Sequence, residues 1–471
     1  MGIIRDLRLK NPKSARVEFG RFHGIDLRTD GEVGGYNKAK MSYNFSTEDG
    51  ALKSTLGVVT LNDRFYADTL EGLSKVYFFK NCYYDKGIRD DRILIYCDSG
   101  NMYEAPLSGG KFTYVSGLGF KNRPIGVCYN FNSKDVIIFS AEGEGIKIYD
   151  GDTVTEVLDA PSITSMCMHS ERLFVTSGGV DGALWFSDDF DPTNWNISLN
   201  EAGFIDMNDG RGDMLCAVSF AGYLYVFRSY GVSRVSAFVN QDEFSVSHLV
   251  VSCGKIIKDS VTVCGDCILF FASDGLYRFD GTTAVKISSG WDSVINKYVS
   301  RMKGVYYDGY AYYQVGIEVE KGKLMQGMIK VDPYTGDCTV IYAGDIYDLA
   351  VVDSEDEYTL LGLDLGAYTL CTFKTNAGCY GDPIQMRWYS KESDFGITSR
   401  QKNLREISFY SNTGVTLTVW VDGKENKYTV KPDKGRCRLR PNLLGSKFSF
   451  LIFVEGVEVE ISGFALEFTY Y

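Results

Sequence analysis

Residues 261–280, VTVCGDCILFFASDGLYRFD, are the stretch that decides how this chain folds. They contain three apolar runs, separated by Gly-Asp at 265–266 and by Ser-Asp-Gly at 273–275. The run ILFF is apolar throughout, as expected for a strand that is covered on both faces of its sheet. The turn residues between the runs are those that favour tight connections between antiparallel strands.

The same pattern repeats in both directions along the chain. Copies begin 41 to 49 residues apart, with a mean spacing of 45, at Val76, Ile125, Met166, Leu215, Val261, Val305 and Ile346. Three to four short strands at this period are typical of propeller blades, which bury their faces only by packing against each other. We therefore predict an all-β chain with a β-propeller of about seven blades. A large β-sandwich or an irregular β-protein is the alternative, because the copies share a pattern and not identical residues.

The flanks of the repeat differ from it. Residues 1–60 are polar and Gly-rich, and we expect an extended N-terminal arm with short strands before a propeller at 61–380. Residues 381–471 alternate apolar and polar side chains at period 2, which predicts a C-terminal β-sandwich. Within it, Asp422-Gly423 has the composition of a two-residue hairpin turn. One helix is expected at 289–299, where Trp291, Val294, Ile295 and Tyr298 share a face.

Composition restricts the class of protein. The 471 residues include 14% aromatics, 50 Gly and 9 Pro, which suits many short strands joined by tight turns. The net charge of −12 disfavours wrapping of nucleic acid. No secretory signal and no 18-residue apolar run is present, so we expect no membrane insertion. Twelve scattered Cys favour reduced thiols in a protein made in the cytoplasm.

Residues suited to metal binding or acid–base chemistry are few. The three His, His23, His169 and His248, lie in different segments, and each is expected to be a surface or turn residue. Cys264 and Cys267 have the C-x-x-C spacing but no second pair, so a blade turn is the preferred interpretation over a zinc site.

The loop that contains Asp206, Asn208, Asp209 and Asp213 has oxygen ligands that could hold Ca²⁺. Its spacing does not match a calcium loop, and a solvated acidic loop is the preferred interpretation. The string Arg-Gly-Asp at 211–213 is short enough to occur by chance.

The segment from Ser177 through Asp181 to Trp185 is similar to the Asp-box of sialidase-type propellers, but its Ser-to-Asp spacing is wrong. A blade turn is the preferred interpretation. No nucleophile-elbow, phosphate-loop or zinc-protease motif occurs in the sequence. We therefore predict that the protein is not an enzyme, with no catalytic residues, no cofactor and no metal.

Several phrases resemble the packaged-DNA stabilisation proteins, which are propeller-containing tail accessory factors of short-tailed phages. The phrases are GID (24–26), GAL (50–52), GVVTL (57–61), ALWF (183–186), DPTNW (191–195), YLYVF (223–227), WYSKESDFGITSRQKNLREISFYS (388–411) and VTLTVWVDGK (415–424). The resemblance is one of pattern and order along most of the chain.

The resemblance implies a structural subunit of a phage virion tail, assembled in the host cytoplasm. Such subunits form a multi-copy ring, often six-fold, that acts as a nozzle or plug below the portal and adaptor. Partners would be further copies of the chain, the portal and adaptor, other tail proteins, and packaged DNA that passes without sequence-specific binding. An acidic channel wall would let DNA slide because it repels phosphate.

Two alternatives belong to other classes. A distal tail or receptor-contact protein would bind host-surface glycans through an exposed aromatic cluster, for which Tyr83, Tyr84, Tyr310, Tyr312 and Tyr313 are candidates. The same tyrosines could equally be blade core. A propeller hydrolase would need two carboxylates that converge in the central pocket.

Overall fold

The computed structural model describes residues 13–27, 35–66, 72–177, 182–199, 202–238, 240–249, 253–288, 302–320, 323–397 and 400–470. Strands dominate these residues, and the helical elements among them are short 3-10 turns. No helix in the described part of the chain is long and apolar enough to cross a membrane. The chain divides into two compact units. The sandwich unit comprises Met1–Gly57, Asp337–Ala343 and Lys374–Tyr471, and the propeller unit comprises Val58–Gly336 and Gly344–Phe373.

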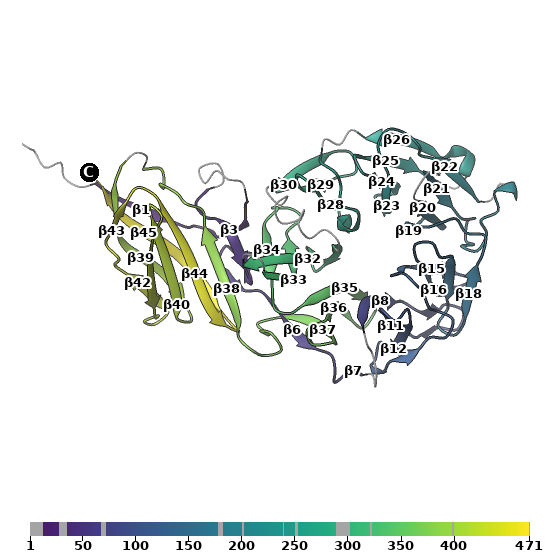
Figure 1. The fold of residues 1–471 in the computed structure, drawn as a ribbon, viewed down its shortest axis with the longest axis horizontal. Coiled ribbons are helices and arrows are strands. Elements are labelled where there is room, and N and C mark those ends of the chain that lie inside the picture. The colour runs from purple at the N-terminus through teal and green to yellow at the C-terminus, as the bar shows by residue number, and fades with distance from the viewer. Residues whose placement is uncertain are drawn as a thin grey trace, which may run out of the picture. The chain divides into compact units, whose positions relative to one another are not determined.

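The propeller unit consists of small antiparallel sheets arranged around a ring, with the first strand of each sheet nearest its middle (Figure 1). The first three sheets, blades 1 to 3, have these strands: β8 (Leu73–Phe79), β11 (Arg92–Cys97), β12 (Met102–Pro106) and β14 (Thr113–Tyr114); β15 (Ile125–Phe131), β16 (Lys134–Ser140), β17 (Ile146–Tyr149) and β18 (Val154–Val157), with β9 (Cys82–Tyr83) and β10 (Ile88–Arg89) added; β19 (Ser165–His169), β20 (Arg172–Thr176), β21 (Ala183–Phe186) and β22 (Gly203–Asp206).

Blades 4 to 6 repeat the pattern. Their strands are β23 (Met214–Phe220), β24 (Tyr223–Arg228), β25 (Gly231–Ser236) and β26 (Ser245–Leu249); β27 (Thr262–Cys264), β28 (Cys267–Ala272), β29 (Gly275–Phe279) and β30 (Ala284–Ser288); β35 (Ile346–Asp353), β36 (Tyr358–Asp364), β37 (Thr369–Thr375) and β6 (Leu56–Thr60). A short parallel pair, β7 (Phe65–Tyr66) with β13 (Gly110–Lys111), is added beside blade 1. Around the axis of the ring, β15 contacts β19, β19 contacts β23, and β35 of the last blade contacts β8 of the first, so the predicted 45-residue repeat closes into one body.

The expected count of about seven blades is corrected to six. The copy that begins near Val305 contributes β31 (Lys303–Tyr307), β32 (Tyr310–Glu320) and β33 (Lys323–Val331), which pair as a three-stranded meander between blades 5 and 6. The sequence pattern counts apolar runs. The pattern does not show whether the three strands of this copy gain a fourth strand from the same unit and so form a separate blade.

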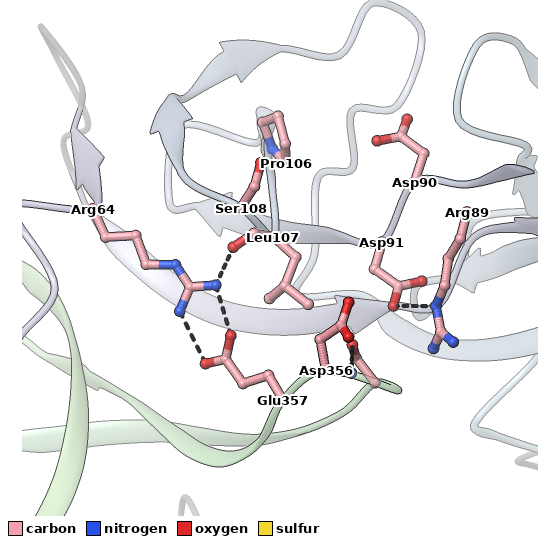
Figure 2. A pocket seen from close by; sticks show the side chains of 10 residues that line it. Arg64, Arg89, Asp90, Asp91, Pro106, Leu107, Ser108, Asp356 and Glu357 are labelled. Carbon is pink, nitrogen blue, oxygen red and sulfur yellow. Dashed lines mark hydrogen bonds and ion pairs between the residues drawn. The ribbon is translucent and has the colours of Figure 1, made fainter.

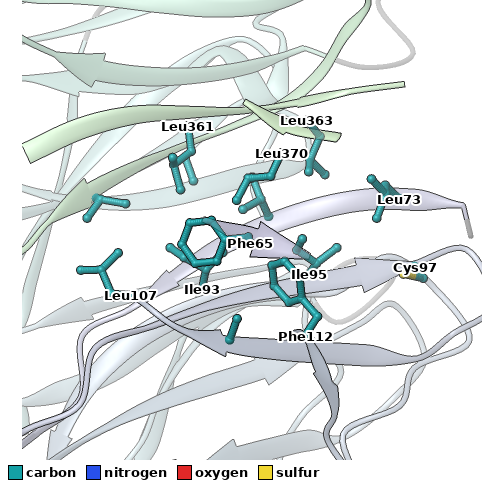
Figure 3. Packing of buried hydrophobic residues seen from close by; sticks show 14 residues of the cluster. Phe65, Leu73, Ile93, Ile95, Cys97, Leu107, Phe112, Leu361, Leu363 and Leu370 are labelled. Carbon is teal, nitrogen blue, oxygen red and sulfur yellow. The ribbon is translucent and has the colours of Figure 1, made fainter. Parts of the chain in front are cut away.

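Blade 6 combines strands from distant parts of the chain. Its outermost strand, β6, comes from before blade 1, whereas β35, β36 and β37 follow the last repeat. Blades 1 and 6 bury a shared apolar cluster, in which Ile93 and Ile95 of β11 face Leu361 and Leu363 of β36 (Figure 3). Because the two ends of the repeat meet in this cluster, it closes the ring.

The sandwich unit contains two sheets. One has the order β4 (Phe45–Ser46), β5 (Leu52–Ser54), β45 (Glu460–Tyr470), β39 (Lys402–Ser411) and β42 (Arg436–Leu439), joined by β1 (Lys13–Glu18) and β43 (Leu443–Gly445). The other has β34 (Cys338–Ile341), β3 (Lys38–Tyr43), β38 (Ile384–Ser390), β44 (Phe448–Gly456), β40 (Val415–Val421) and β41 (Lys424–Val430), joined by β2 (His23–Ile25). Aromatic rings fill the space between them, with the Phe450 and Phe464 centroids 5.9 Å apart.

Residues of the expected N-terminal arm are strands of the sandwich unit. Lys13 to Glu18 pair antiparallel with β45, in register from Lys13↔Tyr470 to Glu18↔Ala465. The polar composition of this segment suggested an arm, but its backbone pairing is with the far end of the chain, which sequence spacing does not reveal. The predicted hairpin turn is confirmed: Val421 pairs with Lys424, and Asp422 and Gly423 have φ of 49° and 80°. The helix expected at 289–299 lies outside the described residues.

Candidate functional site

The first strands of the propeller unit enclose a cavity of about 540 Å³, which we call the axis cavity. Its lining comes from blades 1 to 5 and the β31–β33 meander, together with the residues just before their first strands, and each of these segments contributes two or three residues. The lining residues are Lys75, Tyr77, Arg123, Ile125, Gly126, Thr164, Ser165, Met166, Cys216, Val218, Lys258, Asp259, Val261, Met302, Lys303 and Gln314.

A fully buried carboxylate stands behind the cavity wall. Asp348 on β35 is 0% exposed and accepts a hydrogen bond from the backbone N–H of Val76 at 2.9 Å. Its two oxygens face two cations of the lining, Arg123 at 3.0 Å and Lys303 at 3.3 Å. Burial of a charge is tolerated when it is paired and hydrogen-bonded in this way. Asp348 therefore positions Arg123 and Lys303 at the wall.

The other two cations of the cavity donate to backbone carbonyls. Lys75 Nζ donates to the carbonyl of Pro124 at 2.7 Å, and Lys258 Nζ donates to that of Thr164, also at 2.7 Å. Neither has a carboxylate within 4.0 Å among the described residues. Burial and then the positive charge of Lys303 lower the pKa of Lys75 from 10.5 to about 7. Four cations and one carboxylate, Asp259, line the cavity in a protein whose net charge is −12.

Neutral polar groups complete the cavity. Burial raises the pKa of Tyr77 well above its ordinary value, and its hydroxyl donates to the Pro124 carbonyl at 2.6 Å. Burial also raises the pKa of the Cys216 thiol to about 12, so this sulfur is neutral and not nucleophilic at physiological pH. The cavity offers cations and uncharged donors, which is chemistry suited to holding an anion.

A second, smaller pocket lies on the propeller unit between blades 1 and 6 (Figure 2). It has a volume of about 280 Å³, and most of its charged groups are paired. Arg64 contacts Glu357 at 2.6 Å and also donates to the Leu107 carbonyl, and Arg89 contacts Asp91 at 2.8 Å. Arg64 with Glu357, and Arg89 with Glu355 at 2.7 Å, connect to the β35–β36 turn of blade 6, and these pairs account for the lining without a ligand.

The three His are dispersed, as their separation in sequence predicted. His23 lies 3.1 Å from Asp337 in the sandwich unit. His169 lies on β19 and is buried beside Ser219, with 2.8 Å between Nδ1 and Oγ, and burial lowers its pKa. The expectation of a surface or turn residue is therefore wrong for His169. His248 lies 3.0 Å from Ser233 at the outer strand of blade 4.

The C-x-x-C pair forms a blade turn. Cys264 ends β27, Cys267 begins β28, and the two pair directly across the hairpin. Both are 0% exposed, and burial raises the pKa of both thiols. No group of three or more His, Cys, Asp or Glu that could hold a metal occurs in the described part of the chain.

The acidic loop at 206–213 is organised by arginines. Asp209 pairs with Arg228 at 2.6 Å and with Arg211 at 2.5 Å. Asp206 accepts the backbone N–H of Asn208 at 2.8 Å. The carboxylate that would be central to a calcium loop is therefore already neutralised by guanidinium groups, and Arg211 of the Arg-Gly-Asp string is one of them.

The tyrosine candidates separate into core and surface. Tyr312 and Tyr313 are 2% and 0% exposed and belong to the core. Tyr84 is 54% exposed, and its hydroxyl donates to Asp135 at 3.2 Å. Trp185 is half-buried and stacks on Phe204 with 4.8 Å between centroids, whereas Asp181 lies outside the described residues.

The sequence matches no known protein-family model and no curated protein. Among solved structures, it is similar to a chain in the crystal structure of BBS1N in complex with ARL6DN soaked with lead, with a TM-score of 0.42, 11% identity and coverage of 64% of this chain and 93% of that chain. It is also similar to the extracellular domain of BT4673 from B. thetaiotaomicron, with a TM-score of 0.42, 10% identity and coverage of 70% of this chain and 41% of that chain. At such identities the similarity extends to the fold and not to a function.

Sequence reasoning missed the axis cavity. Lys75, Arg123, Lys258, Lys303 and Asp348 lie in different repeat copies and belong to no motif. The available signal was a charged residue inside an otherwise apolar first strand, as with Lys75 in LSKVYFF. In a first strand whose other residues are mostly apolar, a charged residue indicates a side chain that lines the axis cavity.

Proposed function

We propose that this protein is a structural subunit of a bacteriophage tail, which assembles with further copies of itself into a ring below the portal and adaptor. The ring would extend the DNA channel and help to retain packaged DNA. The proposal is supported by the resemblance of several sequence segments along most of the chain to the packaged-DNA stabilisation proteins.

The observation that carries the proposal is the outer edge of the propeller unit. The last strands of blades 1, 2, 3 and 5, which are β14, β18, β22 and β30, end their sheets. Large apolar side chains on or directly after these strands are exposed: Tyr114 at 54%, Leu158 at 86%, Phe204 at 50% and Val285 at 60%. We call these four residues the propeller rim.

Exposed apolar side chains on edge strands favour contact with another protein surface. A ring subunit needs lateral contact surfaces of this kind, since every copy must contact two neighbours. The rim supplies apolar area, and the backbone edges supply hydrogen-bonding groups. These features suit a structural protein whose partner is another folded chain.

The axis cavity would not itself be the DNA path. At about 540 Å³ it has the size of a small-molecule pocket, and its lining is basic. In the proposed assembly, DNA would pass through the opening that several subunits enclose, where the overall acidic charge of the chain would repel phosphate.

The test is the mass of the purified chain by light scattering, alone and with the portal–adaptor complex of a short-tailed phage. We expect the 52.6 kDa chain to join the complex in a fixed ring number. Leu158→Ser should weaken this assembly without changing the melting temperature, and Leu444→Ser, an exposed leucine in the sandwich unit, is the matched control. A chain that ignores the portal complex yet binds host cells or glycans would overturn the proposal in favour of a receptor-contact protein.

A further inference from the structure

The axis cavity has hydrogen-bonding capacity that the fold does not use. Lys75 and Lys258 each donate to one backbone carbonyl, although an ammonium group has three N–H donors. The Nε of Arg123 is buried and has no hydrogen-bond partner among the described residues. All three groups line the same space.

The charge of the cavity is unbalanced. Four cations line it, namely Lys75, Arg123, Lys258 and Lys303, and the carboxylates beside them are Asp259 in the lining and Asp348 behind the wall. Repulsion between like charges in a partly buried space lowers the stability of the fold. A fold that needed no ligand would therefore be more stable with uncharged residues at these positions. An anion in the cavity would remove this repulsion.

Apolar side chains alternate with the cations. Ile125, Met166, Val218, Val261 and Met302 line the cavity, and Met302 is only 2% exposed. Bare inorganic ions gain nothing from such contacts, whereas the carbon skeleton of an organic molecule does. The volume of about 540 Å³ lies within the range of small-molecule sites.

We propose that the axis cavity of the propeller unit binds a small organic polyanion, with carboxylate or phosphate groups held by Lys75, Lys258, Arg123 and Lys303. This site is independent of the ring proposed above, because every group that forms it comes from a single chain. The ligand accepts hydrogen bonds from the remaining N–H groups of Lys75 and Lys258, and Asp348 keeps Arg123 and Lys303 in place.

Binding depends on pH through Lys75. The charged groups that face it are Lys303, Arg123, Asp348 and Asp259, and Tyr77 lies two residues further along β8. Since its pKa is about 7 in the free protein, Lys75 is largely neutral at higher pH. A bound anion favours the charged form, so binding takes up a proton and weakens as the pH rises above neutrality.

The experiment is calorimetric titration of the full chain with citrate and with fructose 1,6-bisphosphate, each against sodium chloride at equal ionic strength. One probe carries carboxylates and the other phosphates, so the pair distinguishes the two sources of negative charge. We expect at least one of them to bind with a defined stoichiometry of one per chain. Lys258→Met should weaken binding by about tenfold or more, because a charge-assisted hydrogen bond is lost. Lys303→Gln should have a similar effect.

Lys427→Met, at an exposed position of β41, is the matched control and should bind as the wild type does. Melting curves without ligand show whether each variant is folded. Equal binding by the wild type and by folded Lys258→Met and Lys303→Gln would overturn the proposal, as would the absence of heat with both probes. Binding of a hexaglutamate peptide but of neither small probe would also overturn it, in favour of an acidic peptide partner.

Discussion

Arg123 and Asp348 form an ion pair of 3.0 Å across the start of blade 2 and the first strand of blade 6. Arg123 directly precedes the first strand of blade 2, and Asp348 lies on the first strand of the last blade, so this contact exists only after the propeller has closed. Asp348 is 0% exposed, which makes the pair dependent on the surrounding packing.

Replacement of Asp348 should destabilise the propeller unit strongly. In Asp348→Ala, Arg123 and Lys303 lose their shared carboxylate and the Val76 N–H loses its acceptor. Removal of one member of a fully buried ion pair costs about 3–5 kcal/mol. Because the Arg123 and Lys303 side chains are 31% and 30% exposed, the cost here is about 2–3 kcal/mol. We expect a loss of this size in urea unfolding, and a smaller loss for Asp348→Asn, which keeps an acceptor oxygen. Wild-type stability of Asp348→Ala would show that the pair is not buried in solution.

Lys75 should make stability depend on pH in a defined direction. Its pKa is about 7 in the folded protein and 10.5 as an ordinary lysine, so the folded state disfavours the charged form. Below about pH 7 the residue is charged in both states and the full penalty applies. Between about pH 7 and about pH 10.5, the folded state has released the Lys75 proton while the unfolded state still holds it. The free energy of unfolding therefore rises with pH over this range, and the penalty for burying the charge declines.

Lys75→Met removes this penalty. We expect its melting temperature to exceed that of the wild type at about pH 6 and the difference to shrink towards about pH 10. The matched Lys427→Met variant should show no such trend, since that side chain is exposed. A gain that is constant with pH would mean that Met stabilises by packing alone.

The cluster that closes the ring should be sensitive to cavities. Leu363 is 0% exposed between blades 1 and 6, and Leu363→Ala should cost about 2–5 kcal/mol in urea unfolding. Leu158→Ala makes the same chemical change at a residue that is 86% exposed and should be close to neutral. Equal effects of the two substitutions would contradict the packing in Figure 3.

Cys264 and Cys267 should be unreactive in the folded protein. Both are fully buried, and burial raises their pKa values, so the thiolate required for alkylation is scarce. Iodoacetamide at about pH 8 should modify them only after unfolding, as mass spectrometry of the peptides would show. Rapid labelling of the native protein, or zinc in elemental analysis, would restore the metal-site interpretation.

The sequence alone determined the blades and the hairpin turns. Apolar runs such as ILFF with Gly-containing turns every 45 residues specify local antiparallel strands, and Asp422-Gly423 specifies its turn through backbone conformation at two adjacent residues. These features depend on contacts between residues that are close in the chain, so periodicity and turn chemistry are sufficient to predict them.

Only the tertiary structure decided how distant segments combine. It placed β6 in blade 6, paired Lys13 with Tyr470, and left the Val305 copy with three strands in the propeller unit. It also brought Lys75, Arg123, Lys258 and Lys303 to one cavity from four repeat copies or the loops between them. Ring closure sets which side chains meet at the axis, and residues that meet in this way share no spacing in the sequence.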